Sequence, residues 1–186
     1  MNTIKIGLLG LGNIGTGAYK TLSMNETHIS HMLGARLEIS RILEKDTDRD
    51  RGIYIDKRKF TQEPDDIFND PEIRIVIELL GGVEPATSYM LAAMNAGKSV
   101  VTANKAAVAA NYLKLMETAR RNNVEFRFEA SVGGGIPVIN ALSTVLRANQ
   151  IEEVLGIVNG TTNYILTQMA DNGLDYNEAL SAAQHK

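Results

Sequence analysis

The segment that decides the fold is IKIGLLGLGNIG, residues 4–15. Its first six residues are mostly aliphatic, which is typical of a parallel strand buried on both faces, and residues 13–22 fit a helix. Between them stand Gly10, Gly12 and Gly15, in the spacing GxGxxG. A glycine-rich turn between a buried strand and a helix presents backbone N–H groups to an anion. The segment therefore predicts a site for a phosphate-containing ligand.

Strand and helix patterns alternate along the rest of the chain. We expect strands at 4–9, 36–43, 73–80, 99–102, 124–128 and 151–158, and helices at 13–22, 25–33, 84–96, 111–122, 138–147, 161–172 and 175–183. The highly charged segment 44–66 is interpreted as a solvated loop or surface helix. Short links between alternating strands and helices indicate a parallel sheet with helices on both faces. We predict a doubly wound α/β fold of the Rossmann type over residues 1–130. Residues 131–186, where the composition becomes rich in glycine, are predicted to form the start of a second, α+β domain.

The composition excludes several classes of function. The chain has 186 residues, 44% of them hydrophobic, and a formal net charge of −3, so it lacks the basic surface expected for nucleic acid or an anionic membrane. No apolar run approaches the roughly 18 residues of a membrane span, and we expect a cytoplasmic protein. The absence of cysteine excludes disulfides and catalysis by a cysteine nucleophile.

The glycine turn in this context predicts a nicotinamide dinucleotide cofactor. In such a turn the first glycine permits the tight bend, the second lets the pyrophosphate approach the backbone, and the third lets helix and strand pack closely. The other positions line the cradle through their backbone. The predicted cradle residues are Gly10, Leu11, Gly12, Asn13, Ile14 and Gly15.

The end of the second predicted strand is expected to face the adenosine ribose. Glu44, Lys45 and Asp46 follow that strand. A carboxylate there favours the free 2′-hydroxyl of NAD, whereas a cation favours the 2′-phosphate of NADP. Negative and positive side chains are adjacent here, so these residues leave the choice between NAD and NADP open.

The later strands of the sheet predict the chemical end of the site. Ligands bind at the carboxyl ends of parallel strands, so residues at and just after the ends of the later strands should surround the nicotinamide. These are Leu80, Gly81, Thr102, Asn104 and Lys105. Lys105 is the candidate catalytic residue, because a lysine at the rim of a partly apolar pocket can hold an anion or transfer a proton. A surface lysine that simply begins a helix is the alternative.

Five stretches in order along the chain are more specific than the glycine turn. They are GLLGLGNIG (7–15), ELLGG (78–82), VVTANKA (100–106), FEASVGGGIPVI (128–139) and GIVNGTTNYIL (156–166). Together they resemble homoserine dehydrogenases over nearly the whole chain. The resemblance implies an NAD(P)-dependent oxidoreductase that interconverts L-homoserine and L-aspartate 4-semialdehyde by hydride transfer, in threonine, methionine and isoleucine biosynthesis.

The same resemblance implies roles for particular residues. Lys105 would lie beside the nicotinamide and the substrate and help to move or stabilise a proton. Gly160 and Thr161 would contact homoserine. A sodium ion would be held largely by main-chain carbonyls, and hard oxygen ligands suit such a cation. From the residues alone the glycine run is interpreted as a flexible hinge. The implied ligands are Glu129, Val132, Gly134 and Ile136.

The chain departs from the family pattern at its end. It stops at residue 186, before a segment that in the family carries an acidic substrate ligand and a second lysine. We therefore expect a truncated enzyme that binds its cofactor but has little activity alone, and a homodimer for the full-length protein. Two alternatives stay open: another Rossmann-fold dehydrogenase, and a non-enzymatic module that senses the dinucleotide.

Overall fold

Six parallel strands form one sheet in the computed structural model, which describes residues 2–185. The strands are β1 (Asn2–Leu9), β2 (Ala35–Leu43), β3 (Phe60–Thr61), β4 (Ile73–Glu78), β5 (Ser99–Thr102) and β6 (Phe126–Arg127). Their order across the sheet is β3-β2-β1-β4-β5-β6, and every neighbouring pair is parallel. The order reverses between β1 and β4, which is where an open parallel sheet binds its ligand. The predicted doubly wound fold is confirmed.

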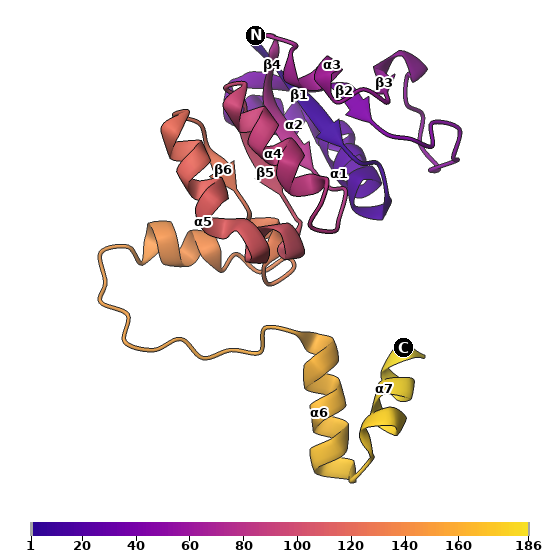
Figure 1. Ribbon diagram of the computed structural model, residues 1–186, viewed down its shortest axis with the longest axis vertical. Helices are drawn as coiled ribbons and strands as arrows, with labels where there is room; N and C mark the ends of the chain where they lie inside the picture. The colour runs from indigo at the N-terminus through magenta and orange to yellow at the C-terminus, as the bar shows by residue number, and fades with distance from the viewer. Residues whose placement is uncertain (1, 186) are drawn as a thin grey trace. The chain divides into compact units, whose positions relative to one another are not determined.

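Helices cover both faces of this sheet (Figure 1). They are α1 (Asn13–Met24), α2 (Glu26–Leu33), α3 (Asp65–Phe68), α4 (Ala86–Asn95) and α5 (Lys105–Arg121). In Figure 1, α4 lies in front of the strands, and α1 and α2 lie behind them. No helix within residues 2–185 is both long and apolar enough to cross a membrane.

The buried side chains form two clusters, one on each face of the sheet. Leu8 belongs to a cluster that includes Ile6 and Ile42 and packs against Tyr19 of α1. Leu9, the next residue of β1, belongs to the other cluster, with helix residues such as Met90 and Leu115. Successive side chains of a strand point to opposite faces, so a strand buried on both sides must be apolar throughout. Leu8 and Leu9 are both fully buried, as the run of aliphatic residues predicted.

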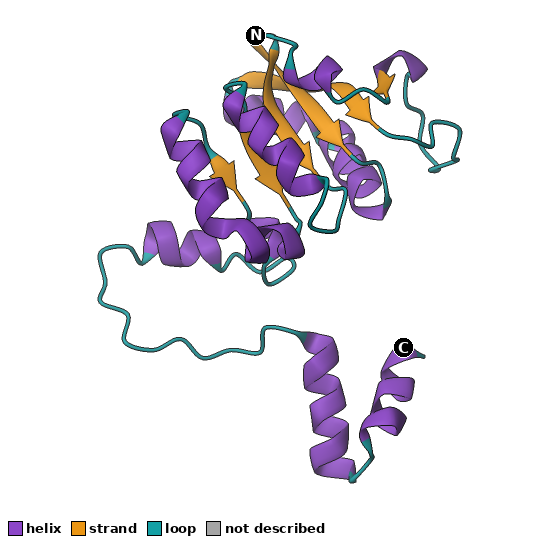
Figure 2. Cartoon of the chain, viewed as in Figure 1, coloured by secondary structure: helices purple, strands orange, loops and turns teal. Residues whose placement is uncertain are grey.

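The chain divides into two compact units, Met1–Ser131 and Val132–Lys186. The second unit contains a short π-helix (Ala141–Val145), α6 (Gly160–Asn172) and α7 (Tyr176–Gln184). A capping box begins α7, because the Asp175 side chain accepts from the Glu178 amide and the Glu178 side chain accepts from the Asp175 amide. Figure 2 draws the described residues of this unit as helices and loops.

Four expectations about secondary structure differ from the structure, two of them about strands and two about helices. The strand expected at 151–158 is an extended segment without secondary structure, because no strand within the described residues of the second unit pairs with it. The charged segment contains a strand, β3, which pairs with the end of β2. The helix expected at 111–122 is present through Arg121, but α5 begins earlier, at Lys105, because the Asn104 side chain accepts from the Ala107 amide and caps it; a kink at Asn111, with φ −133° and ψ 21°, separates the added turn from the expected helix. The helix expected at 138–147 is represented by the shorter π-helical turn.

Candidate functional site

The glycine turn connects β1 to α1 at the point where the strand order reverses. Gly10 has φ +90°, and a Cβ there would lie 2.9 Å from the carbonyl oxygen of Leu79. A Cβ on Gly15 would overlap the carbonyl oxygen of Gly10. These two positions therefore require glycine for the turn itself, because α1 begins directly against the end of the sheet.

Gly12 is different, because no atom of residues 2–185 outside its own neighbourhood in the chain lies within 4 Å of where its Cβ would be. Gly12 is the N-cap residue of α1, with extended backbone angles and no side chain to accept from the first amides of the helix. The first turn of α1 also contains no acidic residue. Amides at a helix start have no partner within the helix, so this uncapped start with an open approach fits an anionic phosphate group.

The carboxylate of Glu44 binds to the backbone of the glycine turn and of the loop after β2. Its oxygens accept from the amides of Leu11, at 2.9 Å, and Asp46, at 3.0 Å. Burial alone would raise the pKa of Glu44, but these amide hydrogen bonds and the nearby Arg51 guanidinium lower it below the ordinary value of 4.5. Because the Leu11 amide donates to Glu44, the amides that remain for a phosphate are those at the start of α1.

Arg51 fixes the loop after β2 onto the glycine turn. Its guanidinium donates to three backbone carbonyls, those of Leu11 at 2.9 Å, Arg49 at 2.9 Å and Asp46 at 2.7 Å. It also lies 3.4 Å from the Glu44 carboxylate, and its side chain is only 5% exposed. An arginine in a charged segment carries no sequence signal for such burial, and sequence reasoning missed it.

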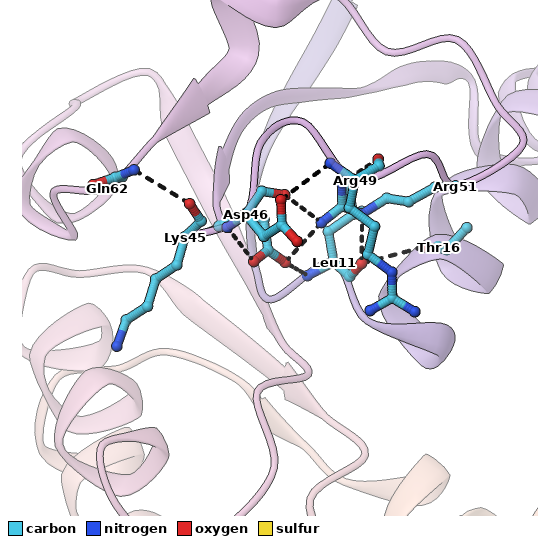
Figure 3. A network of polar contacts seen from close by, with 8 residues as sticks. Leu11, Thr16, Lys45, Asp46, Arg49, Arg51 and Gln62 are labelled. Atoms are coloured by element: carbon cyan, nitrogen blue, oxygen red, sulfur yellow. Dashed lines mark hydrogen bonds and ion pairs between the residues drawn. The ribbon is translucent and has the colours of Figure 1, made fainter.

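The lysine and arginine side chains near the end of β2 and the start of α1 have different surroundings. Lys45 is exposed, and in Figure 3 its side chain points away from Asp46 and Arg51. A cavity of about 430 Å³ lies instead between the start of α1 and the loop after β2. Its lining includes two cations, Lys20 and Arg49, whose side chains form no hydrogen bond or ion pair with any residue in the 2–185 range. The full lining is Gly12, Asn13, Thr16, Gly17, Lys20, Arg49, Asp50 and Arg51.

A buried carboxylate organises the other end of the site. Glu78 ends β4 and is fully buried. It accepts from the Thr102 hydroxyl at 2.6 Å and from the Leu80 amide at 2.8 Å, with the Asn104 side-chain amide at 3.5 Å. The Asn104 side chain also donates to the Gly82 carbonyl at 2.7 Å. Sequence reasoning missed Glu78, although its motif ELLGG was recognised, because a single glutamate at a strand end does not reveal its burial.

The predicted residues Thr102 and Asn104 are both buried, and their side chains bond within the protein. Their side chains therefore hold the loops after β4 and β5 together. Lys105 follows them as the exposed first residue of α5. The loop after β4 reaches the same edge of the sheet, with Leu80 partly exposed and Gly81 at φ +80°. The structure thus brings the predicted nicotinamide residues together at the carboxyl ends of β4 and β5.

The remaining predicted residues are divided between the units. Gly160 and Thr161 form the exposed first turn of α6 in the second unit, where the Asn159 side chain caps the helix through the Thr162 amide. Of the residues expected to hold sodium, Glu129 belongs to the first unit, and Val132, Gly134 and Ile136 belong to the second. The substrate contacts and the sodium site stay predictions.

Two family models match the chain. One, described as the NAD binding domain of homoserine dehydrogenase, matches residues 10–129, and one described as homoserine dehydrogenase matches residues 137–186. The chain belongs to the homoserine dehydrogenase family. The sequence resemblance is confirmed, and the first match agrees with a nicotinamide dinucleotide as the cofactor.

Individual members of the homoserine dehydrogenase family align with nearly all of this chain. The homoserine dehydrogenase of Bacillus subtilis is 40% identical over 99% of the chain, and that of a Synechocystis species is 42% identical over 98%. The crystal structure of a homoserine dehydrogenase from Thiobacillus denitrificans superposes with a TM-score of 0.88, at 40% identity over 99% of the chain. The chain spans 42% of the length of each of these relatives.

Proposed function

We propose that this chain binds a nicotinamide dinucleotide at the glycine turn and acts in the homoserine dehydrogenase reaction, the interconversion of L-homoserine and L-aspartate 4-semialdehyde. The observation that carries the proposal is the uncapped start of α1 with an open approach at Gly12, beside the reversal of strand order. Both features are what a pyrophosphate needs, and the family to which the chain belongs supports the substrate.

When bound, the nicotinamide ring supplies or accepts the hydride. Lys105 stands at the edge of the sheet where that ring is expected, and its ammonium group can hold the substrate oxygen and stabilise or transfer its proton. A lysine at the start of a helix is unfavourable for the helix by about 0.3–1 kcal/mol, because the helix dipole is positive there. Helix stability therefore does not explain this residue, whereas anion binding does.

The cavity beside α1 supports NADP rather than NAD as the preferred cofactor. Both oxygens of Glu44 already accept backbone hydrogen bonds, which reduces its capacity to bind a ribose hydroxyl. The cavity is lined by the cations Lys20, Arg49 and Arg51 and by the acid Asp50, so a phosphate on the ribose would meet an excess of positive charge. We therefore assign the 2′-phosphate to Arg49 and Lys20, in place of Lys45, which is not among the residues that line the cavity.

Titration with NADPH and NADH in parallel, followed by nicotinamide fluorescence, tests the cofactor choice. The wild-type chain should bind NADPH more tightly. Arg49→Gln should weaken NADPH binding by at least about tenfold, since a charge-assisted hydrogen bond contributes roughly 1.5–3 kcal/mol, and should leave NADH binding unchanged. Lys45→Gln is the matched control and should affect both equally. Tighter binding of NADH in the wild type would assign the ribose to Glu44. If neither cofactor bound saturably, the proposed function would be contradicted.

The reaction itself is tested by homoserine oxidation with NADP⁺. In a protein that contains this chain and turns over homoserine, Lys105→Ala should abolish turnover while the dissociation constant for NADP⁺ changes little. Turnover at the wild-type rate in this variant would remove Lys105 from the reaction. We further propose that the full-length protein is a cytoplasmic homodimer, which sedimentation and cell fractionation can test.

A further inference from the structure

Glu78 is a buried acid that the proposed reaction does not use. It lies beneath the two loops that carry the predicted nicotinamide residues, 79–82 and 102–105, and is bonded to both. Within residues 2–185 it forms no ion pair with a lysine, arginine or histidine. A buried charge without a counter-ion is costly unless several hydrogen bonds satisfy it.

The hydrogen bonds around Glu78 fit a charged carboxylate. The Thr102 hydroxyl accepts from the Asn104 amide at 2.9 Å, so its single proton points toward Glu78. The Leu80 amide can only donate, and the Asn104 side-chain nitrogen is also a donor. All three partners therefore donate to Glu78, and none requires that it carry a proton.

The same bonds fix the geometry of both loops. The Leu80 amide ties the loop after β4 to Glu78, and Thr102 ties the loop after β5. Asn104 then joins the loops directly through the Gly82 carbonyl and caps α5, of which Lys105 is the first residue. The position of Lys105 thus depends on a network with Glu78 at its centre.

We propose that Glu78 is a positioning residue that holds these two loops in one arrangement and supplies a buried negative charge favouring the oxidised nicotinamide. The inference rests on the proposed binding of a dinucleotide. The oxidised nicotinamide ring carries a positive charge, and the reduced ring is neutral. A carboxylate without a counter-ion, buried under the two loops expected to hold the ring, would stabilise the oxidised ring more than the reduced one, because charges interact strongly inside the protein.

Two variants separate charge from geometry. Glu78→Gln removes the charge and keeps the size of the side chain, whereas Thr102→Val removes a hydrogen bond to Glu78 and keeps the charge. Dissociation constants for NADP⁺ and NADPH are measured by calorimetry for each variant and for the wild type. Thermal unfolding followed by circular dichroism establishes that each variant is folded.

Glu78→Gln should raise the NADP⁺ dissociation constant more than that for NADPH, changing their ratio by at least about threefold, because only the oxidised ring carries the charge. Thr102→Val should weaken both forms by the same factor. An unchanged ratio in folded Glu78→Gln overturns the proposal. If Glu78→Gln does not fold, wild-type affinities in Thr102→Val overturn it. Failure of the wild type to bind either form contradicts the proposed function instead.

Discussion

Two glycines of the same turn should respond differently to one added methyl group. Gly15→Ala places a Cβ against the carbonyl oxygen of Gly10, which is backbone and cannot rotate away. The helix must then move relative to the sheet, and overpacking of this kind costs about 1–3 kcal/mol. A shift of α1 also displaces the amides at its start. Gly15→Ala should therefore lose stability and dinucleotide binding together.

Gly12→Ala is the matched comparison. Its Cβ meets no distant part of the described chain within 4 Å, and its φ of −72° is open to any residue. Alanine is a poorer N-cap than glycine, at a cost of roughly 0.5–1 kcal/mol, but it restricts the unfolded chain by about 0.4–1 kcal/mol. The two effects nearly cancel, so its free energy of unfolding should stay within about 0.5 kcal/mol of the wild type. Binding should nevertheless fall, because the methyl group occupies the approach of the pyrophosphate.

Urea denaturation and NADPH titration of both variants give the two quantities. The predicted pattern is a loss of stability in Gly15→Ala alone and a loss of binding in both. Wild-type affinity in a folded Gly12→Ala variant would refute the role of this turn as the phosphate cradle. Wild-type stability in Gly15→Ala would refute the close packing of α1 against Gly10.

The remaining predictions concern stability. Because the pKa of Glu44 is lowered in the folded state, the unfolded state binds more protons in acid, so the stabilisation that Glu44 provides is complete above about pH 4.5 and is lost below it. Thermal unfolding from neutral pH to about pH 3 should show a smaller loss of stability in Glu44→Gln than in the wild type. An identical loss would contradict this. Lys98 is buried and donates to the Asp70 and Ile73 carbonyls. Lys98→Met should lower the free energy of unfolding, measured by urea denaturation, by about 1–3 kcal/mol, because it leaves these two carbonyls unpaired. Lys114→Met, at an exposed position, should lower it little. Asn104→Ala removes the side-chain cap of α5, and the loss of this cap alone should lower the free energy of unfolding by about 0.5–2 kcal/mol. Stability equal to that of the wild type would exclude the cap.

Much of the first unit could be predicted because its signals are local. The aliphatic run before Gly10, the glycine spacing and the alternation of strands with helices each depend on neighbouring residues. The start of α5 was predicted too late, although Asn104 followed by alanine-rich sequence is a helix-start signal. β3 was missed because a strand of two residues has no measurable periodicity.

The parts that could not be predicted depend on contacts distant in the chain. Segment 151–158 has the composition of a strand, but strand formation requires a pairing partner that composition does not specify. The position of Glu44 after β2 was predicted, but its bonds to Leu11 and Arg51 depend on how the next loop folds back. The burial of Glu78 follows from its neighbours in β5, twenty or more residues away.

Hydrogen–deuterium exchange of the wild-type chain, with and without saturating NADPH, tests the central claim most directly. The account predicts slower exchange at the amides of residues 13–15, which start α1, and in the loops 79–82 and 102–105, with no change at the opposite edge of the sheet. Unchanged exchange in residues 13–15 under saturating cofactor would contradict it, because the glycine turn would then not hold the dinucleotide.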